Sequence, residues 1–166
     1  MITVKFLKLR PGARMPAYAT LGSAAADLFA CLDDTDELDG LAVDGGTIVI
    51  PAGGRVSIPT GIAIEPIITS QNTESADSFV ALIFGRSGLG AKYGITLANS
   101  VGVVDSDYRG EIKVALINHS NRPYAVSHGD RIAQIAFVPV ASAKFIEACS
   151  LGETERGGSG FGSTGK

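Results

Sequence analysis

The chain has 166 residues and a mass of 17.1 kDa, which suits one compact domain. Its 45% hydrophobic residues, 19% charged residues and formal net charge of −3 are typical of a globular protein and exclude disorder for most of the chain. The low charge favours a protein that hides part of its surface in an oligomer, and the acidic balance argues against duplex nucleic acid as a partner.

Neither a membrane helix nor a secretion signal is expected. No uncharged run reaches the roughly 18 residues that a membrane span needs, and the first residues alternate apolar and basic side chains instead of forming an apolar block. The two cysteines, Cys31 and Cys149, form neither a disulfide framework nor a zinc pattern. We therefore expect a cytoplasmic protein with no membrane partner.

The hydrophobic periodicity along the chain is that of short β-strands. An alternating run comes first, and further runs rich in Val, Ile and Thr follow it, separated by Gly, Pro, Asn and Asp. These runs are residues 2–9, 47–50, 55–58, 61–64, 79–84, 111–118 and 131–138. One short helix is expected around residues 87–93. Many short strands with few helices predict an all-β sandwich, jelly roll or barrel.

Two polar stretches interrupt the strands. Residues 31–46 contain six acidic residues and no Lys or Arg, which is typical of a solvated loop, with a cation or partner site as the alternative. Residues 68–78 are polar throughout most of their length and indicate a hairpin extension. The pattern assigns no function to either stretch.

Residues 151–166 differ in composition from the rest of the chain. They contain six glycines and one aromatic residue, Phe161, so ordering them costs about 1–2 kcal/mol per residue with little apolar surface to offset it. We expect a β domain at residues 1–150 and a glycine-rich C-terminal arm at residues 151–166. Residues 160–166 match G-x-x-x-x-G-K, but no helix follows, so a P-loop is not expected.

Two interpretations of this arm stay open. One is a simple disordered tail. In the other, closely spaced amides wrap an anion, Arg156, Ser163 and Thr164 add donors, and Phe161 offers a flat face to a base.

Three internal segments carry candidate chemistry, and each has a plain structural alternative. Arg86 and Ser87 lie in Gly-Arg-Ser-Gly-Leu-Gly, which indicates either a phosphate-binding turn or an ordinary one. Residues 99–110 end an apolar run in Asp105, a position that suits a general base or a β-turn. Asp27, after three alanines, is equally open to both interpretations.

Taken together and in this order, these segments resemble the five motifs of the trimeric dUTPase family. The segments are Ala24-Ala25-Ala26-Asp27-Leu28, Arg86-Ser87-Gly88-Leu89, residues 99–110, residues 129–134 and residues 156–165. The resemblance spans nearly the whole chain. Three departures stand out: Ala25-Ala26 replaces Gly-Tyr, Phe84-Gly85 stands where Pro is common, and Ser159 replaces a glycine.

The resemblance implies a distorted jelly-roll β-barrel that assembles as a homotrimer with active sites shared between subunits. It implies hydrolysis of dUTP to dUMP and pyrophosphate with Mg²⁺, which lowers dUTP and supplies dUMP for dTMP synthesis. Asp105 would activate the attacking water, and Asp27 would hold Mg²⁺ indirectly, through water. The substrate-binding residues implied are Arg86, Ser87, Gly88, Asn99, Gly102, Val103, Tyr108, Gln134, Arg156, Phe161, Gly162, Ser163 and Thr164.

Within that set, the resemblance assigns different residues to different parts of the substrate. Asn99, Gly102 and Val103 would read the uracil edge and exclude a thymine methyl by clash. Tyr108 would pack on the deoxyribose and leave no room for a 2′-hydroxyl. Arg86, Ser87 and Gln134 would hold the phosphates, while the arm closes over the site with Phe161 on the uracil.

Two other functions are weighed against this one. The related dCTP deaminases use a strand glutamate at the position that corresponds to Ala115, and an alanine cannot transfer protons. A non-catalytic nucleotide-binding trimer is the alternative from another class, and the presence of Asp105 and of a complete arm argues against it.

Overall fold

The computed structural model describes residues 2–67 and 78–160, which form thirteen strands and one short helix. The strands are β1 (Thr3–Lys8), β2 (Ala26–Phe29), β3 (Glu37–Leu38), β4 (Leu41–Ala42), β5 (Thr47–Ile50), β6 (Arg55–Pro59), β7 (Ile62–Ile67), β8 (Ser78–Gly85), β9 (Ile95–Leu97), β10 (Gly102–Val104), β11 (Lys113–Asn118), β12 (Tyr124–Ser127) and β13 (Arg131–Val140). The helix α1 spans Ser87–Tyr93. In this part of the chain no helix is long and apolar enough to span a membrane.

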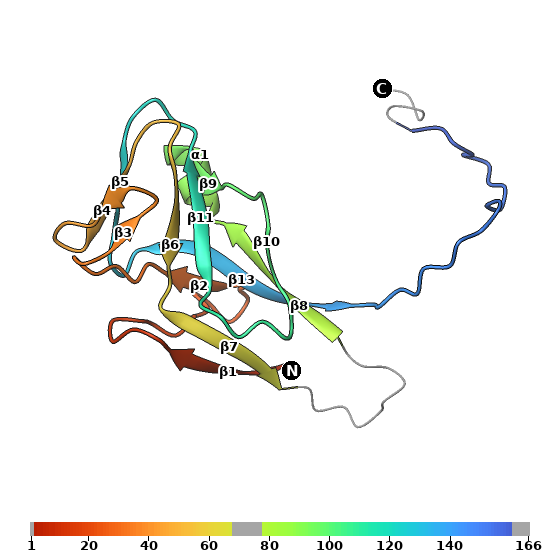
Figure 1. Ribbon diagram of the computed structural model, residues 1–166, viewed down its shortest axis with the longest axis horizontal. Coiled ribbons are helices and arrows are strands. Elements are labelled where there is room, and N and C mark those ends of the chain that lie inside the picture. The colour runs from red at the N-terminus through yellow and green to blue at the C-terminus, as the bar shows by residue number, and fades with distance from the viewer. Residues whose placement is uncertain (1, 68–77, 161–166) are drawn as a thin grey trace.

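The strands pair antiparallel in small sheets (Figure 1). The largest sheet has the order β10-β8-β13-β2, and a three-stranded sheet has the order β6-β11-β9. The pairs β1-β7, β12-β5 and β3-β4 complete the body. The expected all-β fold with one short helix is confirmed.

Alternating burial explains why these segments form strands around one core. In β11 the side chains of Val114, Leu116 and Asn118 point inward while their neighbours are more exposed. Each fully buried Val, Leu or Ile contributes about 1.5–3 kcal/mol. The buried Asn118 is satisfied, because its Nδ2 donates to the carbonyls of Ile50 at 3.1 Å and Arg122 at 2.8 Å.

Helix α1 covers the residues that the sequence predicts. Gly94 ends it in the left-handed conformation, with φ of 69°, a position that favours glycine. Arg86 precedes it in an extended conformation, so strand β8 passes directly into the helix through Arg86.

The expectation of a solvated loop at residues 31–46 is wrong in part. The stretch contains the β3-β4 hairpin, and its apolar residues Cys31, Leu32 and Val43 are buried in the core. Several of its carboxylates bind backbone amides instead of facing only water; Asp39 Oδ2, for example, accepts from Ser57 N at 2.8 Å. Apolar residues before and among the acids therefore anchor the stretch.

Beyond β13, residues 141–160 form no strand or helix and extend away from the body (Figure 1). This segment carries three exposed apolar side chains, Phe145, Ile146 and Leu151, of which Phe145 is 95% exposed.

Candidate active site

A cluster of charged side chains forms where β2 lies beside β13 and β8 ends. Asp27 is only 3% exposed, and three donors surround its carboxylate. Arg86 Nε and Gln134 Nε2 each lie 3.2 Å from Oδ1, and Arg131 Nη1 lies 3.3 Å from Oδ2. Two guanidinium groups and one carboxylate leave one positive charge, which suits an anionic ligand.

The backbone register explains how this cluster forms. Gln134 is the direct partner of Asp27 in the β2-β13 pairing, and Arg86 follows the last residue of β8, which is also paired with β13. Arg86 Nη1 also donates to the carbonyl of Arg131 at 3.2 Å. Ser87 and Gly88 continue from Arg86 into α1 and are exposed.

A second group of predicted residues lies at the end of β10. Asp105 is exposed where the strand ends, and Tyr108 N donates to its carbonyl at 3.1 Å to close a turn. The Tyr108 hydroxyl donates to the carbonyl of Glu111 at 3.1 Å. A shallow depression of about 250 Å³ contains Asp105, Tyr108 and Glu111 in its lining.

Strand β10, which leads to this turn, depends on a glycine for its close packing against β8. Gly102 is buried against β8, and a Cβ there would lie 2.9 Å from Ile83 Cβ. Val103, between two inward-facing residues, is 63% exposed. Strand β10 therefore presents the Val103 side chain outward.

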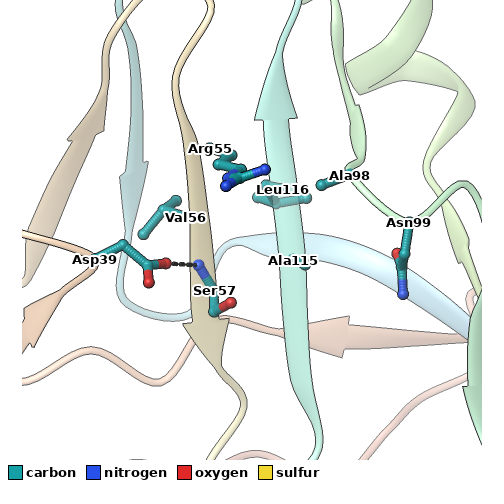
Figure 2. Close-up of a pocket in the computed structure, with 8 residues that line it drawn as sticks. All are labelled: Asp39, Arg55, Val56, Ser57, Ala98, Asn99, Ala115 and Leu116. Atoms are coloured by element: carbon teal, nitrogen blue, oxygen red, sulfur yellow. Dashed lines mark hydrogen bonds between the residues drawn. The ribbon is translucent and has the colours of Figure 1, made fainter.

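Asn99 lines a different feature, an open hollow of about 610 Å³ over β6 and β11. Figure 2 shows Asp39 on one side of this hollow and Asn99 on the other, with Arg55 and Leu116 between them. Ala115 is also in its lining, so the position compared with a deaminase glutamate carries no proton-transfer group.

The predicted site residues therefore lie in separate parts of the folded chain and do not form one cluster. Because Gly102 pairs with Ile83 and Val104 with Ala81, Asp105 lies beside Val80. Arg86 lies six positions beyond Val80, which is about 20 Å along a strand. Figure 1 agrees, with α1 near the top and the turn from β10 to β11 lower down, near β7.

The remaining predicted residues belong to the arm. Arg156 is exposed, and its Nε donates to the carbonyl of Ser159 at 3.0 Å. Phe161, Gly162, Ser163 and Thr164 lie outside the described residues.

Sequence reasoning missed two residues that the structure brings to these clusters. Arg131 belongs to the motif at residues 129–134, and that membership could have suggested it. Glu111 directly follows the motif at residues 99–110, and nothing in the local pattern distinguishes it.

Across residues 2–67 and 78–160, no three His, Cys, Asp or Glu side chains lie close enough to hold a metal ion. Asp27, the residue expected near the metal, instead contacts two arginines and a glutamine. These residues fit a metal that arrives on an anionic ligand and contacts the protein through water.

Comparison with known proteins identifies the family. Residues 13–165 match the dUTPase family model. The deoxyuridine 5′-triphosphate nucleotidohydrolase of Desulfitobacterium hafniense (strain DSM 10664 / DCB-2) is 44% identical over 99% of this chain and 95% of its own length. The enzyme of the same name from Pasteurella multocida (strain Pm70) is 43% identical over 99% of this chain and 97% of its own. The chain belongs to the dUTPase family.

Solved structures share its fold. A mutant dUTPase of Staphylococcus bacteriophage 80alpha with dUpNHpp aligns with a TM-score of 0.78 and 21% identity, over 99% of both chains. A mutant dUTPase from phage phi11 of S. aureus, described with a structural Mg(II) ion, aligns with a TM-score of 0.70 and 18% identity, over 91% of this chain and 99% of its own.

Proposed function

We propose that this protein hydrolyses dUTP to dUMP and pyrophosphate. Its family membership and the names of relatives at 43–44% identity support this reaction. The observation that carries the proposal is the exposed Asp105 at the end of β10, with Tyr108 in the turn it begins. The product dUMP would serve dTMP synthesis.

Asp105 acts as the general base in this proposal. Its carboxylate accepts a proton from a water molecule, whose oxygen attacks the α-phosphorus while pyrophosphate leaves. General bases of this kind contribute about 10²–10⁴-fold to a rate. The exposed position at a strand end leaves room for both the water and the substrate.

The nucleoside is recognised beside the carboxylate of Asp105, the proposed general base. Asn99 and the Gly102–Val103 backbone read the uracil edge, and Tyr108 packs on the deoxyribose. Strand β10 supports such a role because it is held against β8 by close packing at Gly102. A fixed backbone rejects a thymine methyl by clash.

The positive cluster around Asp27 binds the phosphates through Arg86, Ser87 and Gln134. Arg86 and Gln134 donate hydrogen bonds to Asp27 in this structure. If these two side chains turned toward phosphate, the Asp27 carboxylate would be free to accept hydrogen bonds from water. A bound Mg²⁺ would neutralise charge on the phosphate oxygens. Asp27 would hold the water around it.

A site shared between copies of the chain follows from the separation of the two clusters. A general base at the α-phosphorus must lie within a few ångströms of the phosphate-binding groups, yet Asp105 and Arg86 of one chain are about 20 Å apart along the strands. A homotrimer that apposes Asp105 of one subunit to Arg86 of another meets this requirement. The exposed Phe145, Ile146 and Leu151 supply apolar surface for such an assembly.

The C-terminal arm completes the site by closing over the nucleotide. Arg156 and the donors Ser163 and Thr164 contact phosphate, Phe161 covers the uracil, and Gly162 lets the backbone approach. Closure excludes water and orders the triphosphate. The extended course of residues 141–160 supports an arm that reaches beyond its own body (Figure 1).

Pyrophosphate release with Mg²⁺ tests the proposed function. The purified protein is assayed with dUTP, dCTP, dTTP and UTP, and only dUTP is expected to react well. Ammonia release from dCTP would favour a deaminase, against which Ala115 argues. Binding of dUTP without any pyrophosphate would instead favour a non-catalytic nucleotide-binding protein.

A further inference from the structure

We infer that Glu111 is a positioning residue for Tyr108 and that, with Arg10 and Asp36, it sets the preference for deoxyribose over ribose. This inference rests on the proposed function, in which Tyr108 contacts the sugar. It also assigns a task to one carboxylate of the acidic stretch at residues 31–46.

The backbone of Glu111 holds the hydroxyl end of Tyr108. Its carbonyl accepts the Tyr108 hydroxyl at 3.1 Å. The ring lies over Gly110, where a Cβ would be 2.5 Å from Tyr108 Cζ and would also overlap the hydroxyl. Any displacement of residues 110–111 therefore moves the phenol ring.

The side chain of Glu111 is held by two residues from another part of the chain, Gly61 and Arg10. Its Oε1 accepts from Gly61 N at 2.9 Å and lies 3.6 Å from Arg10 Nε, with the side chain only 16% exposed. Gly61 has little freedom to move, since a Cβ there would be 2.8 Å from both Ala13 Cβ and Cys31 Sγ. The carboxylate is thus held by a rigid amide and a cation.

Arg10 is in turn held by the acidic stretch. Its Nη1 donates to both carboxylate oxygens of Asp36, at 2.9 and 2.7 Å, and the Asp36 side chain is 13% exposed. The hydrogen bond with Asp36 raises the pKa of Arg10 above its ordinary value, so the cation stays charged. Asp36 Oδ2 also accepts from Asp33 N at 2.9 Å.

These contacts form a continuous chain from Asp36 through Arg10 and Glu111 to Tyr108. Recognition groups depend on supporting contacts that limit their motion to fractions of an ångström. A Tyr108 ring that can shift leaves space for a 2′-hydroxyl. Breaking one of these contacts therefore weakens the rejection of ribose more than it weakens the binding of deoxyribose.

The test compares deoxyribose and ribose ligands on the full-length protein. Calorimetry gives the Kd for dUpNHpp and for its ribose counterpart, and steady-state assays give kcat/KM for dUTP and UTP. For Glu111→Ala we expect the preference for deoxyribose to fall about tenfold or more. Glu111→Gln, which keeps an acceptor for Gly61 N, is expected to retain most of that preference.

Glu65→Ala is the matched control, because Glu65 makes an exposed ion pair with Lys5 at 3.2 Å, outside both clusters. It is expected to leave the preference unchanged. If Glu111→Ala does not fold, Asp36→Asn and Arg10→Ala are measured in its place, with the same fall expected. Equal losses for both sugars, or no change, would overturn the inference.

The proposed reaction and the proposed role of Glu111 can be disproved separately. Absence of dUTP hydrolysis by the unmodified protein overturns the proposed reaction. The ratio of the two Kd values needs no hydrolysis, so it decides the role of Glu111 separately.

Discussion

Arg86 and Asp105 stand at opposite ends of the contact between β8 and β10. Arg86 follows the last residue of β8, whereas Asp105 follows Val104, which pairs with Ala81 in the middle of that strand. The separation of about 20 Å is set by strand register and cannot be closed by side-chain rotation alone. For the proposed reaction, this separation makes cooperation between chains a specific and testable requirement.

Mixing two inactive variants tests the shared site. Arg86→Ala and Asp105→Asn are each expected to be nearly inactive, and coexpression should restore activity. With equal amounts and random assembly, about a quarter of subunit contacts combine an intact Arg86 with an intact Asp105. Recovered pyrophosphate release near that fraction of the unmodified rate is the expected result.

The control for this experiment pairs Arg86→Ala with Gln134→Ala. Both side chains contact Asp27 of the same chain, so no mixture rebuilds an intact cluster. Restored activity in the control, or none in the main experiment, would contradict a site divided between Arg86 and Asp105.

Replacing Asp105 by Asn removes the proposed base and keeps its shape. We expect kcat to fall about 100-fold or more, while the Kd of dUpNHpp changes little. Rapid-quench kinetics and calorimetry measure the two quantities. Parallel losses in both would indicate that Asp105 serves binding and not proton transfer.

Deleting residues 151–166 tests the arm. Because the described part of this segment is exposed and nearly without apolar contacts, we expect Tm to change by less than about 3 °C. We expect kcat/KM for dUTP to fall about tenfold or more, since closure is lost. A large fall in Tm measured by calorimetry would make the arm structural instead.

Gly102→Ala tests the packing of β10 against β8. The new Cβ would lie 2.9 Å from Ile83 Cβ, so we expect the free energy of unfolding to fall by about 1–3 kcal/mol. Gly22→Ala is the control, because nothing lies within 4 Å of a Cβ there. Urea unfolding measures both, and equal effects would argue against close packing at Gly102.

Asp27→Asn tests the electrostatic cluster. Loss of the buried charge weakens its hydrogen bonds to Arg86 and Arg131, so we expect the free energy of unfolding to fall by about 1–2 kcal/mol. KM for dUTP should rise as the two guanidinium groups lose their fixed orientation. Asp44→Asn, at an exposed position, should change neither quantity.

Local patterns in the chain predict much of the fold. Alternating apolar residues locate β1, β5, β6, β8, β11 and β13. The helix at residues 87–93 agrees with its predicted range, since it follows a strand directly and ends at a glycine. Short strands carry too little alternation to be predicted from the sequence. Strand β2 has three buried residues in succession, and each strand of the β3-β4 hairpin has only two residues.

The order of five motifs was enough to indicate a dUTPase, because that signal needs residue identities and no geometry. The distance between Arg86 and Asp105 needed strand register, and the donors around Asp27 needed the pairing of β2 with β13. The contacts from Asp36 through Arg10 to Glu111 join residues up to 101 positions apart, the separation of Arg10 from Glu111. Local periodicity reports which face of a strand is buried, whereas contacts of this kind arise only when the packed chain brings distant side chains together.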